Sequence, residues 1–214
     1  MPNGTRFRSP MLHVGVLFLG VALVCGLGCQ DTQDATVVED RPETATPDAV
    51  APEPSEGREE AMGFQITSSA FGNGQTIPAK HTADGVDVSP PLAWANVPEG
   101  TKSFVLLCDD PDAPVGNWVH WVAYGIPVDT QELPEGVPTD EVLPSGIKQG
   151  VNDFRKAGYG GPSPPPGKAH RYFFTLYALD ADVSLGPGAR KKVLMDALEG
   201  HILGKAQLMG TYGR

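Results

Sequence analysis

The sequence predicts a mostly β fold over residues 63–214, and three observations support this class. Runs rich in aromatic and β-branched residues stand at 103–108 (SFVLLC), 118–126 (WVHWVAYGI) and 170–180 (HRYFFTLYALD), a composition that favours strands. Glycine and proline, 26 and 21 in the whole chain, gather between these runs, where they favour turns. The length of about 150 residues is enough for one domain with a full hydrophobic core.

The first elements follow in chain order. FQITSSA at 64–70 is expected to form a strand. SPPLAW at 89–94 is an extended segment that its prolines confine to an edge or a turn. SFVLLC is continuously apolar, which fits a central buried strand, and Cys108 at its end is expected to be a small buried hydrophobe. Residues 118–126 and 170–180 supply two further strands.

The segment 187–208 has helical composition. Pro187 suits a first helical turn, whereas Gly200 weakens the middle, so one helix and two helices both stay open. Apolar residues at helical spacing supply a candidate buried stripe, at Val193, Leu194, Ala197 and Leu198.

Residues 1–29 are predicted to be a secretory signal. Arg6 and Arg8 precede an uncharged run at 11–28, the n-region and h-region of such a signal. The run ends in GLGC, which resembles a bacterial lipobox and predicts lipidation of Cys29, although Gly26 stands where a lipobox usually has an aliphatic residue. The signal predicts an exported protein anchored on a membrane of the cell envelope. A soluble secreted form and an uncleaved anchor helix are the alternatives.

Residues 30–62 are predicted to be a disordered tether. They hold ten acids and two arginines with almost no aromatic or β-branched residues, so they lack material for a core. The net charge of −10 divides into +2 for residues 1–29, −8 for residues 30–62 and −4 for residues 63–214. No basic stripe indicates nucleic-acid binding.

Two histidines stand near the beginnings of predicted strands. Side chains alternate along a strand, so each histidine is expected to share a face with apolar neighbours, while Arg171 points the other way. These expected faces are Trp118, His120, Val122 and Tyr124 on one strand, and His170, Tyr172, Phe174 and Leu176 on the other.

A proline- and glycine-rich loop precedes each of these strands, DDPDAPVGN at 109–117 and GYGGPSPPPGKA at 158–169. Glycine lets backbone approach a ligand closely, and successive N–H groups form anion-binding nests. Proline pre-orders a loop and so lowers the entropy lost on binding. We therefore expect both histidines, Tyr172 and two of the three aspartates to converge on a small cavity. Each residue also has a structural interpretation; Asp110 and Asp112, for example, are common turn formers.

The chain resembles the phosphatidylethanolamine-binding protein family, in its bacterial, Raf-kinase-inhibitor-like branch. The stretches that carry the resemblance are SPPLAWANVPEGTKSFVLLCDDPDAP, WVHWVAYGIP, GVNDFRKAGYGGPSPPPGKAHRYFFTLYALD and GHILGKAQLMGTYGR. The resemblance implies a large antiparallel sheet packed on a smaller one, with peripheral C-terminal helices. It also implies a small pocket for phosphate, phosphorylethanolamine-like headgroups or acetate-like anions.

Carried over by motif, the resemblance implies that the pocket residues are Asp110, Asp112, His120, Gly161, Pro162, Pro165, His170 and Tyr172. Bacterial relatives commonly have GGPCPP where this chain has Ser163 in the cysteine position. The change removes a thiol beside the site and leaves anion binding intact.

Carboxylates repel a phosphate dianion, so the two acids of the pocket need an explanation. They hydrogen-bond the histidines, fix the tautomer and raise the histidine pKa, or one accepts a proton from a phosphate hydroxyl or faces an ammonium group. Either arrangement predicts a nearly neutral pocket of modest affinity that weakens as pH rises.

These features favour a binding protein without a cofactor over an enzyme. The expected partners are a small anion and, through the anchor, a membrane; a protein partner stays open. An exported chain does not meet a cytosolic kinase of its own cell, so kinase inhibition is not expected. The alternative is a metal-assisted hydrolase that uses the His/Asp cluster, but the chain has neither an HExxH nor a GxSxG motif. The third hypothesis is a structural or interaction protein whose pocket is vestigial.

Overall fold

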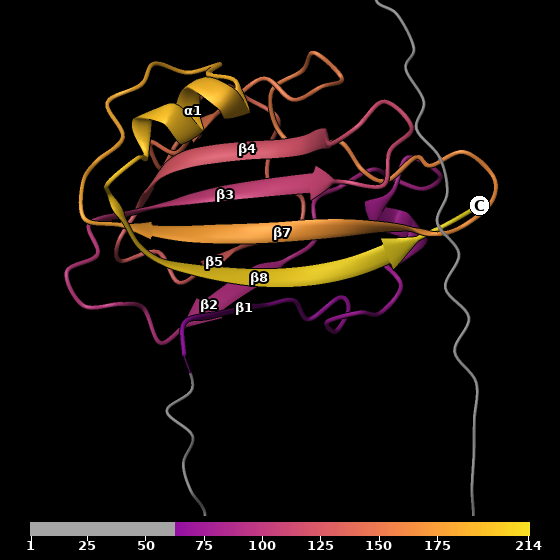
Figure 1. Cartoon of the computed structure of the whole chain (residues 1–214), viewed down its shortest axis with the longest axis horizontal. Helices are drawn as coiled ribbons and strands as arrows, with labels where there is room; N and C mark the ends of the chain where they lie inside the picture. The colour runs from indigo at the N-terminus through magenta and orange to yellow at the C-terminus, as the bar shows by residue number, and fades with distance from the viewer. Residues whose placement is uncertain (1–62) are drawn as a thin grey trace, which may run out of the picture. The chain divides into compact units, whose positions relative to one another are not determined.

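The computed structural model describes residues 63–214, and the predicted signal, Cys29 and the tether lie outside them. Two antiparallel sheets form this unit, a large one in the order β6-β4-β3-β7-β8 and a small one in the order β1-β2-β5 (Figure 1). The elements are β1 (Gln65–Thr67), the 3-10 helix η1 (Ala79–His81), β2 (Leu92–Ala95), β3 (Ser103–Asp110), β4 (Trp118–Pro127), β5 (Glu132–Leu133), β6 (Lys148–Gln149), β7 (His170–Leu179), α1 (Lys191–Ala197) and β8 (Ile202–Tyr212).

β3 is the centre of the large sheet, as its apolar sequence predicts. It pairs with β4 on one side and β7 on the other, and Phe104 to Leu107 have no solvent exposure. Cys108 is buried as well, at 1% exposure. The three strands predicted at 103–108, 118–126 and 170–180 are therefore confirmed.

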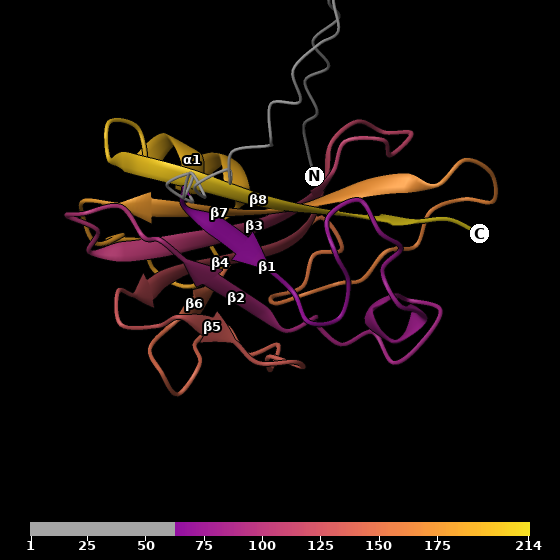
Figure 2. The same ribbon diagram turned by 90° about the horizontal axis from the view of Figure 1, so that it is seen from below.

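Each face of the large sheet is covered by a different layer (Figure 2). Residues such as Phe104, Trp121 and Phe174 pack toward the small sheet, where they join Trp94 in the main core. The opposite face packs on α1 through Leu194 and its neighbours. The fold class predicted from the sequence is confirmed by this two-sheet arrangement.

A β-bulge in β4 changes which side chains share a face. Cys108 pairs with Trp121 and Asp109 pairs with Val119, so His120 lies between two paired residues and has no partner on β3. One extra residue reverses the alternation. His120 therefore lies on the side of the main core with Trp121, whereas Val122 belongs to the core under α1. The predicted common face of His120, Val122 and Tyr124 is wrong for this reason.

The prediction of helix across 187–208 is wrong beyond α1. The helix covers only Lys191–Ala197, and the chain then turns at Gly200 (φ +82°) into β8. β8 pairs with β7 along nearly its whole length, and this pairing overrides the helical composition. Of the predicted stripe, Leu194 and Leu198 are buried but Val193 is 52% exposed.

The segment SPPLAW also differs from its prediction. Its strand, β2, begins at Leu92, directly after the prolines, and lies in the middle of the small sheet between β1 and β5. Because the prolines precede the ladder, no ladder hydrogen bond is lost. Among residues 63–214, no helix is long and apolar enough to cross a membrane.

Candidate functional site

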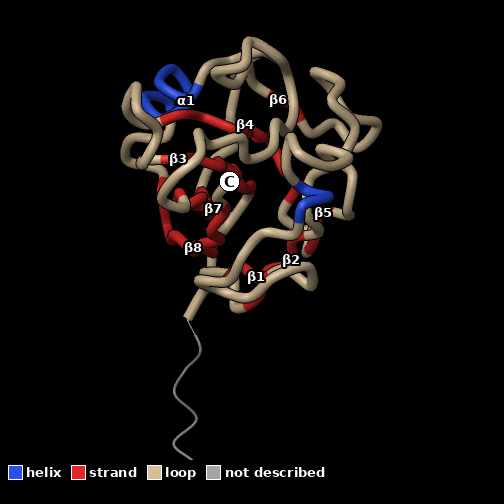
Figure 3. Tube along the Cα trace, turned by 90° about the vertical axis from the view of Figure 1, so that its right-hand side faces the viewer, coloured by secondary structure: helices blue, strands red, loops and turns tan. Residues whose placement is uncertain are grey.

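A cavity of about 240 Å³ lies at one end of the large sheet. Because β3 runs antiparallel to β4 and β7, the end of β3 meets the beginnings of both neighbours there. Figure 3 looks toward this end, where β8 also finishes. Asp110, His120, His170 and Tyr172 supply its polar wall. Ser163 lines it as well, and the rest is mostly apolar, with Pro114, Val115, Trp118, Phe154 and Pro165 among the lining residues.

Five of the eight residues implied by the resemblance line this cavity: Asp110, His120, Pro165, His170 and Tyr172. Asp112, Gly161 and Pro162 do not line it. Of the predicted aspartates only Asp110 lines the cavity itself, whereas Asp112 lines an adjoining hollow of about 270 Å³ that shares Pro165 and His170 with it.

His170 and Asp110 form a buried pair. The Nδ1–H of His170 donates to Oδ2 of Asp110 across 2.8 Å, and the two residues are 8% and 3% exposed. A carboxylate only accepts, so the bond fixes the hydrogen on Nδ1 and leaves Nε2 for a ligand. Oδ1 of Asp110 accepts the Asp112 N–H at 2.8 Å, which holds the turn that follows β3.

His120 is held in a similar way, by backbone. Its Nδ1–H donates to the Gly160 carbonyl across 2.6 Å, which again leaves Nε2 free. The ring makes edge contacts with Tyr172 at 5.1 Å and Phe154 at 5.3 Å between centroids. Burial lowers the pKa of His120, against the opposing effect of the Gly160 hydrogen bond and of nearby carboxylates. The ring is thus neutral near pH 7.

The Tyr172 hydroxyl is buried and has no hydrogen-bond partner within residues 63–214. The residue is 1% exposed and lines the cavity. Burial raises the pKa of Tyr172 well above its usual range, and both the charge of Asp110 and the interaction of its carboxylate with the hydroxyl act in the same direction. The phenol therefore stays protonated, and its hydrogen is available to the Asp110 carboxylate or to a ligand oxygen.

Asp109 and Asp112 have partners away from the cavity. Asp109 accepts from Lys191 at 2.7 Å on the α1 side of the sheet. Asp112 accepts from Arg171 at 2.7 and 2.8 Å, a bidentate pair. The Arg171 hydrogen bonds lower the pKa of Asp112 to about 2. Of the predicted acids, only Asp110 orients a histidine.

Gly161 and Pro162 shape the surrounding loop. The Gly161 N–H donates to Asp87 across 2.7 Å, and the Pro162 carbonyl accepts from the Ala83 N–H across 3.0 Å. A Cβ at position 161 would lie 2.7 Å from the His81 carbonyl oxygen. Glycine is needed there for close backbone packing against the segment that follows η1.

The family model for phosphatidylethanolamine-binding protein matches residues 67–213. The chain belongs to this family. Its relatives include the UPF0098 protein of Methanothermobacter thermautotrophicus, 50% identical over 71% of this chain and 99% of the relative. The UPF0098 protein YbhB of Escherichia coli is 40% identical over 70% of this chain and 99% of its own.

Two solved structures of the phosphatidylethanolamine-binding protein family share the fold. The homologue CT736 of Chlamydia trachomatis gives a TM-score of 0.65 at 41% identity and covers 71% of this chain and 98% of its own. YbcL of E. coli gives a TM-score of 0.67 at 34% identity and covers 72% of this chain and 99% of its own. Residues 63–214 thus correspond to an entire relative.

Sequence reasoning missed Phe154 as a wall of the cavity. The ring contacts both Trp118 and His120, and it also lines a neighbouring groove of about 770 Å³. Phe154 therefore separates the two spaces, with Ser163 as the other residue they share. The residue lies in a turn before Arg155 (φ +63°), and no periodic pattern marks it.

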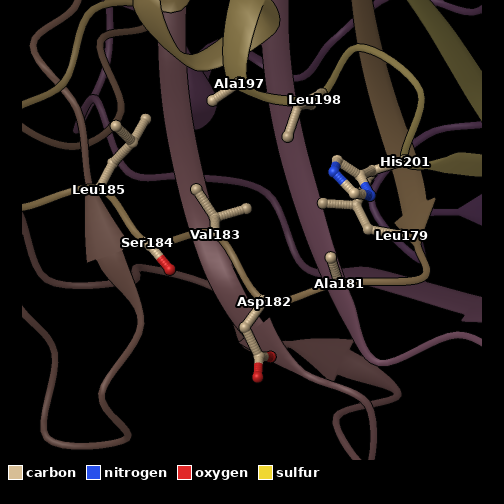
Figure 4. Close-up of a pocket in the computed structure, with 9 residues that line it drawn as sticks. All are labelled: Leu179, Ala181, Asp182, Val183, Ser184, Leu185, Ala197, Leu198 and His201. Atoms are coloured by element: carbon tan, nitrogen blue, oxygen red, sulfur yellow. The ribbon is translucent and has the colours of Figure 1, made fainter.

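A second histidine–carboxylate pair lies far from the cavity. His201 Nδ1 is 2.8 Å from Asp180, next to a hollow of about 190 Å³ between α1 and the loop after β7 (Figure 4). The ten residues of β7 separate it from His170, roughly 30 Å at the usual rise. Across residues 63–214, no group of three or more His, Cys, Asp or Glu side chains is placed to hold a metal ion.

Proposed function

We propose that this member of the phosphatidylethanolamine-binding protein family is an exported, lipid-anchored binding protein. It captures small anions or phosphorylated headgroups in the cavity at the end of β3. The observation that carries the proposal is the Tyr172 hydroxyl, which is buried in the cavity wall and makes no hydrogen bond of normal geometry to any of residues 63–214. Buried polar groups are almost always hydrogen-bonded, so a ligand oxygen is the natural acceptor.

The two histidines support the same role. Each uses Nδ1 internally and keeps Nε2 for the ligand, so the rings are fixed before binding and little side-chain entropy is lost. Within residues 63–214, no lysine or arginine lines the cavity. The expected affinity for a small anion is therefore modest.

Calorimetric titration of residues 63–214 with phosphate and phosphorylethanolamine tests this function. The His170→Ala variant should lose about 1.5–3 kcal/mol of binding free energy, because a hydrogen bond to a charged group contributes that much. His201→Ala is the matched control, since it removes a histidine that is also paired with a carboxylate but lies far from the cavity. No binding by the folded wild-type domain would refute anion capture.

The anchor requires a separate experiment on the whole chain in a bacterial host. We expect the mature protein to enter the detergent phase on Triton X-114 extraction, and Cys29→Ser to move it to the aqueous phase. A wild-type protein that stays aqueous would favour the soluble secreted form.

A further inference from the structure

Residues 164–167 (PPPG), the proline wall, border the cavity and have few means of holding their own position. Three of the four are prolines, which lack an N–H, and Pro164 and Pro165 line the cavity. Consecutive prolines adopt an extended conformation without internal hydrogen bonds. The proline wall must therefore be fixed by contacts with other parts of the chain.

Arg214 makes these contacts. Within the part of the chain that the structure describes, the only hydrogen bonds to the proline wall come from this residue. Its guanidinium donates to the Pro164 carbonyl across 3.4 Å, and its main-chain oxygen accepts the Gly167 N–H across 3.2 Å. One residue thus holds both ends of the wall. β8 brings it there, because Tyr212 at the end of β8 pairs with His170 at the start of β7.

Asp84 in turn fixes the Arg214 side chain. The Nε–H and a second guanidinium N–H of Arg214 donate to the two carboxylate oxygens, the first across 2.8 Å. The Tyr212 hydroxyl donates to the same carboxylate across 2.8 Å. These hydrogen bonds, chiefly that from Arg214, lower the pKa of Asp84. A bidentate pair holds a guanidinium in one orientation, here with its remaining nitrogen toward the proline wall.

We propose that Arg214, held by Asp84, is a positioning residue that fixes the proline wall and so sets the affinity of the cavity without contacting the ligand. Neither residue lines the cavity. A wall that is fixed before binding lowers the entropy lost when the ligand enters. The inference rests on the proposed anion capture, and it adds two residues outside the pocket to those that determine binding.

Calorimetry with phosphate tests the role of Arg214 in residues 63–214, a segment that corresponds to an entire relative. Arg214→Gln should weaken binding by about twofold to thirtyfold, the range for residues that act without ligand contact. Arg214→Lys keeps the charge but not the bidentate geometry, so it should lose a similar factor. Full affinity in Arg214→Lys would overturn positioning and assign the effect to charge. Lys192→Gln, which breaks an exposed ion pair on α1, is the control and should bind like wild type.

Trypsin digestion reports on the proline wall directly, because the exposed Lys168 follows it. Cleavage after Lys168, identified by mass spectrometry, should become faster in Arg214→Gln, while the urea midpoint stays close to wild type. Protease access then reflects local opening rather than global unfolding. An unchanged rate at Lys168 would overturn the inference. So would faster cleavage at all sites with a lowered midpoint, because a general loss of stability would then explain the weaker binding.

Asp84→Asn is the second variant and decides the question if Arg214→Gln does not fold. It removes the charge that orients Arg214 and leaves the main-chain hydrogen bond to Gly167 in place. Weaker phosphate binding with faster cleavage after Lys168 would support the inference, and wild-type behaviour in both measurements would overturn it. Absence of phosphate binding by the wild-type domain would refute anion capture instead, and the digestion would still show whether Arg214 holds the wall.

Discussion

The Nδ1 of His170 lies 2.8 Å from a carboxylate oxygen of Asp110, sixty positions earlier in the chain. Both residues are buried, one at the start of β7 and the other at the end of β3. The pairing of these two antiparallel strands brings the residues together. The pair thus links the stability of the sheet to the geometry of the cavity.

Replacing Asp110 with Ala should lower the free energy of unfolding by about 1–3 kcal/mol, because the buried Nδ1–H of His170 loses its acceptor. A double-mutant cycle with His170→Ala should give a coupling energy of 0.5 to about 3 kcal/mol. Urea unfolding at pH 7 measures both. The exposed Asp180–His201 pair is the control and should couple by less than about 1 kcal/mol. Additive effects at Asp110 and His170 would show that the hydrogen bond is not formed.

Gly161→Ala should destabilise the domain without removing a ligand contact. The new Cβ would lie 2.5 Å from Asp87 Oδ1 and 2.7 Å from the Thr82 Cα, and overpacking of this kind typically costs about 1–3 kcal/mol. At roughly 2–4 °C per kcal/mol, thermal melting should show a fall of several degrees. Gly186→Ala, with no atom within 4 Å of the new Cβ, should melt like wild type. Equal melting of the two variants would contradict the close packing at Gly161.

Breaking the Asp112–Arg171 pair should lower stability at neutral pH and leave it nearly unchanged near pH 2. The folded pKa of Asp112 is about 2, against an ordinary 3.8, mainly because Arg171 hydrogen-bonds it. Because the folded pKa is lowered, the stabilisation that the pair gives to the folded state is fully present above pH 3.8 and is lost as pH falls through 2. Unfolding measured from pH 2 to 5 should therefore show wild type and Arg171→Met converging toward pH 2. If the difference in unfolding free energy between the two proteins stayed constant over this range, protonation of Asp112 would not break its pairing with Arg171.

Phosphate affinity should fall as pH rises. In the bound state, a proton on the phosphoryl group or on a cavity histidine offsets negative charge, so that ligand and cavity share it. Loss of this shared proton places uncompensated negative charge beside the Asp110 carboxylate and weakens binding. Because burial lowers the pKa of His120, this ring loses its proton below the ordinary value of 6.5. Titrations from pH 5 to 8 should show affinity falling by up to about tenfold per pH unit once both groups are deprotonated. A flat profile would be incompatible with a shared proton.

The sequence was sufficient to predict the three long strands of the sheet centre and not β8. β3 is apolar from Phe104 to Cys108, and β7 is rich in aromatic residues, so local composition already favours a strand. β8 reads ILGKAQLMGTY, with many good helix formers. It becomes a strand because it pairs with the free edge of β7. This pairing is a tertiary interaction, which the local sequence of β8 does not reveal.

The site was predictable in its main residues and not in their partners. The order of strands brings Asp110, His120, His170 and Tyr172 to one cavity, as the two loop-and-histidine patterns predict. The bulge at His120 depends on a mismatch between two strands, so the alternation of β4 alone gives the wrong face. The motif assigns Asp112 to the pocket, but its side chain pairs with Arg171, a tertiary contact that the local sequence does not predict.

Phe154 gives a starting point for inhibitor design. Its ring, 37% exposed, is the partition between the cavity at the end of β3 and a larger groove, and an exposed side chain changes rotamer in nanoseconds or less. A phosphonate fragment in the chamber and an aromatic fragment in the groove would approach each other across one movable ring. A short linker that displaces this ring would join the two fragments into one compound.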